Sequence, residues 1–224
     1  IGGETSERTA IATRTAMWRT SPGNSVPLIG RELAWRQIRD AFDEQCNGGF
    51  IVISGEPGAG KTRLLQEFTH QSDGLVLAGR SHVGTRSQPF YPVIEALRQG
   101  LATPGFGQDV APALLAETAC LLPEVTAMFP QLPRSMGGEP RHGRSRLFEG
   151  LVQILHTLSV RQRLLVCLDD LQWADDSTLA WLQYAAVRIR STAICFLVTY
   201  CVDEGENLRS LRRSGRVWRV AVDA

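Results

Sequence analysis

The chain has 224 residues, with 24 Lys or Arg against 23 Asp or Glu and a formal net charge of +1. This length fits one large domain whose core is stable without disulfides or a structural metal. A charge near zero argues against a protein that binds nucleic acid or a membrane surface through a basic excess. No stretch reaches the roughly 18 apolar residues of a membrane-spanning helix, and the first residues lack the apolar run of a secretory signal.

The five cysteines are odd in number and show no C-x-x-C spacing. A zinc site or a disulfide framework is therefore not expected, and a reducing cytoplasm fits this cysteine usage. The sequence begins with Ile1 rather than Met, so we expect it to be a fragment of a longer chain.

Residues 1–26 are polar and rich in Thr, Ser and Gly, which predicts a flexible lead-in before a domain over 27–224. From Arg31 onward the apolar residues recur at helical spacing, and two glycines at 48 and 49 end the pattern. The apolar positions of this predicted helix are Ala34, Ile38, Ala41 and Phe42.

Short apolar runs typical of strands buried on both faces follow along the chain. They lie at 50–54, 75–78, 164–168, 194–199 and 217–222. Helical patterns separate them, and a long helical stretch over 91–160 stands between the second and third runs, interrupted by predicted loops at 102–109 and 130–143. Alternating strands and helices predict an α/β fold with a mostly parallel sheet and helices on both faces.

Between the first strand and the next helix, the chain matches G-x-x-x-x-G-K-[ST] in full. The residues are Gly55, Glu56, Pro57, Gly58, Ala59, Gly60, Lys61 and Thr62. Glycines let successive backbone N–H groups converge on a phosphate, and the following helix points its positive end at the same anion. Lys61, the single lysine of the chain, would reach the β- and γ-phosphates, and the Thr62 hydroxyl would ligate Mg²⁺.

The third apolar run ends in two carboxylates, Asp169 and Asp170. Ligands gather at the carboxyl ends of parallel strands, so we expect Asp169 to face the phosphate loop and hold Mg²⁺. Asp170 would orient or deprotonate an attacking water, although adjacent aspartates after a strand also form turns and helix caps. We expect Asp175 and Asp176 to cap the next helix.

Several segments together resemble the ATPase module of large bacterial regulators, the STAND-type NTPases related to the AAA superfamily. These proteins include the ATP-binding LuxR-type transcription regulators, and similar modules are fused to nucleotidyl cyclases. The segments are PLIGRE at 27–32, the phosphate loop, GRSHVGTRSQPFYPVIEALR at 79–98, LLPEV at 121–125 and LDDLQWADDSTL at 168–179. The resemblance covers roughly residues 27–222.

The resemblance implies a P-loop NTPase three-layer sandwich with strand order 5-1-4-3-2 and a helical insertion between strands 2 and 3. It places adenine near Leu28, Ile29 and Gly30, so the expected nucleotide-binding residues are Ile29, Gly30, the loop and Arg63. ATP and Mg²⁺ are the expected cofactors, and slow hydrolysis would act as a switch that controls self-association or an output domain. DNA would be bound only through a downstream domain absent from this sequence. A helical lid is likewise expected to be absent from it. No membrane partner is expected.

One position departs from the pattern of these proteins. They usually carry Thr-Tyr-Arg after the fourth strand, with an arginine that senses the γ-phosphate, whereas this chain reads Thr199-Tyr200-Cys201. The change puts turnover in doubt and leaves a scaffold that binds nucleotide without hydrolysing it as one alternative. A module of a cyclase-linked signalling protein is another. Thr199 is either a contact to phosphate or water, or a strand-end hydroxyl whose hydrogen bonds are satisfied within the protein.

Overall fold

The computed structural model describes residues 30–44, 48–133, 140–201, 210–211, 213 and 215–222, and the predicted lead-in over 1–26 lies outside them. The strands are β1 (Gly49–Gly55), β2 (Leu75–Arg80), β3 (Leu164–Asp169), β4 (Ile194–Cys201) and β5 (Val217–Val222). The helices are α2 (Glu32–Glu44), α3 (Lys61–Gln71), α4 (Tyr91–Gly100), α5 (Pro112–Thr118), α6 (Glu124–Met128), α7 (Pro140–Ser159) and α8 (Asp176–Arg188). Two 3₁₀ turns, η1 (Val83–Thr85) and η2 (Leu171–Trp173), follow β2 and β3.

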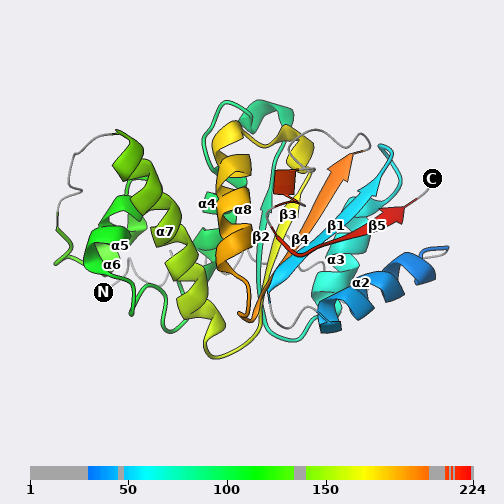
Figure 1. Cartoon of the computed structure of the whole chain (residues 1–224), viewed down its shortest axis with the longest axis horizontal. Coiled ribbons are helices and arrows are strands. Elements are labelled where there is room, and N and C mark those ends of the chain that lie inside the picture. Colours follow the sequence, from blue (N-terminus) through cyan, green and yellow to red (C-terminus); the bar gives the residue numbers. More distant parts are fainter. Residues whose placement is uncertain are drawn as a thin grey trace, which may run out of the picture.

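The five strands form one sheet in the order β2-β3-β4-β1-β5, and every pair is parallel. Read from the other edge, this is the predicted order 5-1-4-3-2. Because all strands point the same way, the segments that leave β1, β3 and β4 emerge at one edge of the sheet, as Figure 1 shows.

The inner strands are buried on both faces because they are mostly apolar, and neither β1 nor β3 has an exposed residue. Successive side chains of β1 alternate between two cores, with Phe50 and Val52 in one and Ile51 and Ile53 in the other. The predicted run over 50–54 is thus confirmed as a central strand.

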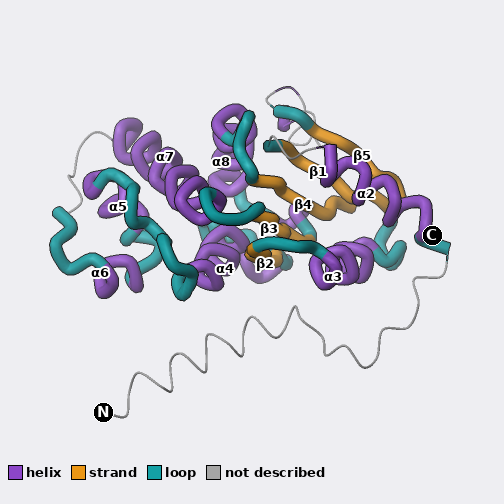
Figure 2. Tube along the Cα trace, turned by 90° about the horizontal axis from the view of Figure 1, so that it is seen from below, coloured by secondary structure: helices purple, strands orange, loops and turns teal. Residues whose placement is uncertain are grey.

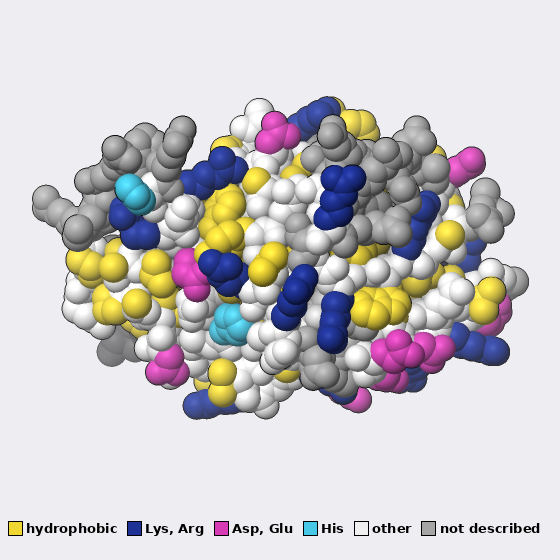
Figure 3. All heavy atoms as spheres, in the orientation of Figure 1, with side chains coloured by type: hydrophobic (Ala, Val, Ile, Leu, Met, Phe, Trp, Pro, Cys, Tyr) yellow, Lys and Arg dark blue, Asp and Glu magenta, His cyan; other side chains and the backbone are white. Residues whose placement is uncertain are grey.

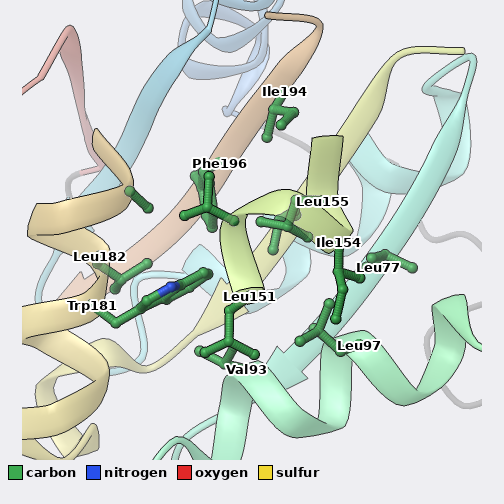
Figure 4. Packing of buried hydrophobic residues seen from close by; sticks show 14 of the residues in the cluster. Leu77, Val93, Leu97, Leu151, Ile154, Leu155, Trp181, Leu182, Ile194 and Phe196 are labelled. Carbon is green, nitrogen blue, oxygen red and sulfur yellow. The ribbon is translucent and has the colours of Figure 1, made fainter. Parts of the chain in front are cut away.

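Helices cover both faces and form the outer layers of the predicted sandwich. Helices α4, α7 and α8 pack on one face, where Trp181 lies edge-on to Phe196 with ring centroids 6.0 Å apart, as Figure 4 shows. Helices α2 and α3 cover the other face. Figure 2 shows α5, α6 and α7 gathered at the end of the molecule opposite α2.

The helix expected from residue 31 is confirmed as α2, and its buried side chains are the four predicted ones. The insertion between β2 and β3 contains α4 to α7. One boundary prediction was wrong, because α7 begins at Pro140, inside the segment predicted as a loop over 130–143. Proline is well tolerated in the first turn of a helix, where its missing N–H has no partner to lose.

Side chains of α4 form hydrogen bonds with backbone groups of β2, which is the outermost strand on that side of the sheet. The Gln99 side chain accepts a hydrogen bond from the Ala78 N–H and donates one to the Ala78 carbonyl. One turn away, Glu95 Oε2 accepts from the Arg80 N–H at 2.8 Å. These contacts fix the carboxyl end of β2 relative to α4. Among the described residues, no helix combines the length and apolarity needed to cross a membrane.

Candidate functional site

The loop between β1 and α3 has the backbone shape of an anion cradle. Gly58 and Gly60 both have φ of +83°, a left-handed conformation that favours glycine, and a β-carbon at either position would meet no atom within 4 Å. The turn is closed by a hydrogen bond from the Ala59 N–H to the Glu56 carbonyl at 3.2 Å. No side chain caps α3, so its first N–H groups face the space enclosed by the loop.

Lys61 is 94% buried, with 6% of its side chain area exposed. Its Nζ donates to the carbonyls of Gly55 at 2.9 Å and Glu56 at 2.7 Å. The Lys61 ammonium group is therefore bound by carbonyls of the phosphate loop itself. This places the cation beside the loop amides that would bind an anion.

The next residue, Thr62, connects the loop to the end of β3. Its Oγ1 donates to Asp169 Oδ1 at 3.2 Å, across 107 residues of sequence. Asp169 Oδ1 also accepts a hydrogen bond of 2.6 Å from Thr199 Oγ1. Thr199 Oγ1 in turn accepts one of 2.8 Å from the Asp170 N–H. The structure thus brings Thr62 and Asp169 together, and Thr199 is a strand-end hydroxyl whose hydrogen bonds are satisfied.

Asp169 is fully buried, and its second oxygen, Oδ2, accepts no hydrogen bond. Burial raises the pKa of this carboxyl, while the hydrogen bond from Thr199 opposes the rise. A buried carboxylate oxygen without a donor, next to a hydroxyl, is an oxygen set suited to a hard cation such as Mg²⁺. The residues present therefore fit the metal that the sequence implies. Among the described residues, no three His, Cys, Asp or Glu side chains cluster as a metal site by themselves.

Asp170 has a left-handed backbone with φ of +58°, which Asp tolerates better than most residues. Its Oδ2 accepts from Arg80 Nη2 at 2.9 Å, and its Oδ1 accepts from Gln172 Nε2 at 2.9 Å. Gln172 also accepts from the Cys201 N–H at 3.0 Å. The carboxylate that sequence reasoning assigned to water is therefore bound by two side-chain donors.

Arg80 is a site residue that sequence reasoning missed. It is the last residue of β2, and its Nε lies 3.4 Å from Asp169 Oδ2 and 3.2 Å from Asp170 Oδ2. The hydrogen bond to Asp170 raises the pKa of the Arg80 guanidinium, which therefore stays charged. The signal was available, because the rule that identified Asp169 at the end of a parallel strand applies equally to Arg80.

Beyond η2, Asp175 caps α8 as predicted, and its Oδ1 accepts from the N–H groups of Ser177 at 2.9 Å and Thr178 at 3.0 Å. Asp176 lies in the first turn of the helix. Trp181 is buried in the core, whereas Trp173 lies in η2 and is 36% exposed.

The expected adenine side of the site falls largely outside the described residues, which exclude Leu28 and Ile29. Gly30 is an exposed turn residue with φ of +76°. Arg63 lies in the first turn of α3, after Thr62. Cys201 ends β4 and pairs in register with Gly55, at the start of the phosphate loop.

A hollow of about 490 Å³ lies elsewhere, among residues that precede β2 and β3 and side chains of α2. Its lining includes Arg39, Asp43, Asp73 and Arg163. Because strands run from this end toward the phosphate loop, the hollow and the loop lie at opposite edges of the sheet.

The AAA ATPase domain family matches residues 27–197. Among solved structures, the chain is similar to a STAND protein with a tetratricopeptide repeat sensor from Pyrococcus horikoshii, at 18% identity and a TM-score of 0.43, covering 92% of this chain and 24% of that one. It is also similar to Drosophila ORC bound to AT-rich DNA, at 14% identity and a TM-score of 0.40, covering 97% of this chain and 59% of that one. The chain therefore spans about a quarter of the STAND protein.

No curated protein matches the sequence. The family match alone covers well over half of the 224 residues. The chain belongs to the AAA ATPase domain family.

Proposed function

We propose that this chain is a switch module that binds Mg²⁺-ATP and hydrolyses it slowly. The observation that carries the proposal is the hydrogen bond between Thr62 and Asp169. It joins the phosphate loop to a buried carboxylate in one site, at the edge of the sheet where nucleotides bind in this type of fold.

In this proposal Lys61 and the loop amides bind the β- and γ-phosphates. Thr62 and Asp169 hold Mg²⁺, which when bound neutralises charge on the phosphate oxygens. Support comes from the buried ammonium group of Lys61 and from Asp169 Oδ2, a buried oxygen that accepts no hydrogen bond. The remaining nucleotide contacts are the other loop residues (Gly55 to Gly60), Arg63, Gly30 and Ile29.

Asp170 would orient the attacking water. Its oxygens already accept from Arg80 and Gln172, which leaves fewer lone pairs for a water. A base that is partly occupied by other donors is consistent with slow turnover.

The wider role follows the resemblance of the motifs to STAND-type regulators. We propose that residues 27–224 are the regulatory ATPase part of a cytoplasmic bacterial transcription regulator of the LuxR type. In that setting the module would associate with itself, and DNA would be bound through a separate downstream domain.

The second candidate function is a scaffold that binds nucleotide without hydrolysing it, and Cys201 favours it. The thiol stands beside Gly55 in register, where related regulators carry an arginine. Measuring phosphate release in a single turnover separates the two candidates, because only the ATPase releases phosphate. A Cys201→Arg variant should release it faster if the missing arginine limits turnover.

The proposed function is tested by equilibrium titration of ATP with Mg²⁺ against the parent chain and Lys61→Ala. Removing a charge-assisted contact should weaken binding at least about tenfold. Arg98→Ala is the matched control, since it removes a cation whose partner, Glu124, lies on the surface with it. Binding that is the same in the parent and in Lys61→Ala would sink the assignment.

A further inference from the structure

We propose that Arg80 recognises the terminal phosphate of ATP, supplying from the end of β2 the guanidinium that position 201 lacks. This inference rests on the proposed function. It assigns to Arg80 the discrimination between a nucleoside triphosphate and a diphosphate.

The backbone holds Arg80 at the end of β2, next to Asp169. Its Cα pairs in register with that of Asp169, and its N–H donates to Glu95 Oε2 at 2.8 Å. The side chain starts from this fixed point and crosses the Asp169 carboxylate, whose Oδ2 is 3.4 Å from Nε. Since Oδ1 of that carboxylate bonds Thr62, the guanidinium and the Thr62 hydroxyl lie on either side of one carboxylate.

The Arg80 guanidinium has more N–H donors than its present partners use. Arg80 uses Nε and Nη2 on Asp170, and 51% of its side chain is exposed. A guanidinium has five N–H donors in a planar fork, so several remain for phosphate oxygens while the bond to Asp170 persists. Because Asp169 is fully buried, a rotation of the guanidinium away from it is favourable only when a cation takes its place beside the carboxylate.

The charge of the site also favours a role for Arg80. Asp169 and Asp170 carry negative charge at the edge of the sheet, and ATP would add one more phosphate than ADP. Lys61 serves the β- and γ-phosphates from the loop, and Cys201 contributes no cation at the end of β4. A divalent ion held at Asp169 would repel the guanidinium from Oδ2, while the bond to Asp170 would keep it within the site. Arg80 is therefore placed to compensate the added charge of the third phosphate.

The test compares the dissociation constants of Mg²⁺-ADP and a non-hydrolysable Mg²⁺-ATP analogue for the parent, Arg80→Gln and Arg80→Lys. Arg80→Gln should weaken binding of the triphosphate about ten- to a hundredfold and leave ADP within about twofold. The dissociation constant of the triphosphate analogue for Arg80→Lys should lie between those of the parent and Arg80→Gln, since lysine keeps the charge but lacks the planar set of N–H donors. Arg188→Gln is the matched control, because Arg188 also pairs with a carboxylate, Glu149, on another face.

A loss that is equal for both nucleotides, or no loss for either, would overturn the inference. The proposed function is judged separately, by whether the parent binds nucleotide in a way that depends on Lys61. A thermal melt of each variant without nucleotide shows whether the fold is retained. In the Arg80→Gln background, Cys201→Arg should restore the preference for the triphosphate. A double variant without that preference would contradict the claim that Arg80 substitutes for position 201.

Discussion

The Asp169 side chain combines a functional position with a cost to the fold. It is fully buried, and only one of its two oxygens accepts hydrogen bonds, from Thr62 and Thr199. Desolvation raises the pKa of the carboxyl, so the ionised form is less favourable in the folded chain than in the unfolded one. A charge that destabilises the empty protein is understandable if a cation neutralises it in the loaded one.

Replacing Asp169 with Asn should therefore stabilise the chain in the absence of nucleotide and metal. We expect the free energy of unfolding at pH 7 to rise by about 1 kcal/mol, because the amide carries no charge and still accepts from Thr62 and Thr199. The sign follows from linkage. A raised folded-state pKa gives stability that is present below the ordinary value of 3.8 and lost as the pH rises through the raised value.

The difference in unfolding free energy between Asp169→Asn and the parent, measured by urea titration, should thus increase from about pH 4 to pH 7. Asp176→Asn is the control, because Asp176 is exposed in the first turn of α8 and its neutralisation should bring no gain. A variant at Asp169 that is less stable than the parent at every pH would contradict the prediction.

Among the elements, the starts of α4 and α8 are joined by one carboxylate. Asp175 Oδ1 accepts from two N–H groups at the start of α8, and its Oδ2 accepts from the Phe90 N–H at 3.0 Å. Phe90 precedes α4 and has a left-handed φ of +60°. Because Asp175 lies only two residues after η2, these bonds also restrain the loop that carries Asp170.

Asp175→Ala should cost about 2 kcal/mol of unfolding free energy, since it removes a helix cap and leaves a further N–H without its acceptor. Asp176→Ala, one residue along, should cost no more than about 0.5 kcal/mol, because it only removes a charge near the helix start. Chemical denaturation of both variants measures the difference. Equal losses would show that the bond to Phe90 and the cap at Ser177 and Thr178 carry little energy.

The sequence predicted most elements because their apolar spacing was unambiguous, as in α2 and the buried strands. It failed at the start of α7, since Pro and Gly both interrupt helices and occur at their first turns, and local pattern does not decide between these outcomes. Thr62 was predictable from the phosphate-loop motif, and Asp169 from its place at the carboxyl end of a buried strand. The contact between Arg80 and Asp170 was not, because it depends on two side-chain rotamers across 90 residues of sequence.

At the scale of the whole molecule, the carboxyl ends and the amino ends of the parallel strands differ in chemistry. The phosphate loop, Asp169 and Arg80 share the carboxyl edge, and the hollow near Arg163 lies at the other. On the face seen in Figure 3, Lys and Arg side chains form separate groups rather than one continuous patch. The features that favour an anionic ligand therefore converge at the carboxyl edge.

Hydrogen exchange of the backbone amides, with and without Mg²⁺-ATP, tests whether nucleotide binds at the phosphate loop and Asp169. We expect slower exchange in peptides covering residues 55–62 and 169–173 when Mg²⁺-ATP is present, and no such slowing in Lys61→Ala. Slower exchange confined to residues 71–74 and 162–163, around the opposite hollow, would contradict it. So would exchange in the phosphate loop that is unchanged by saturating nucleotide.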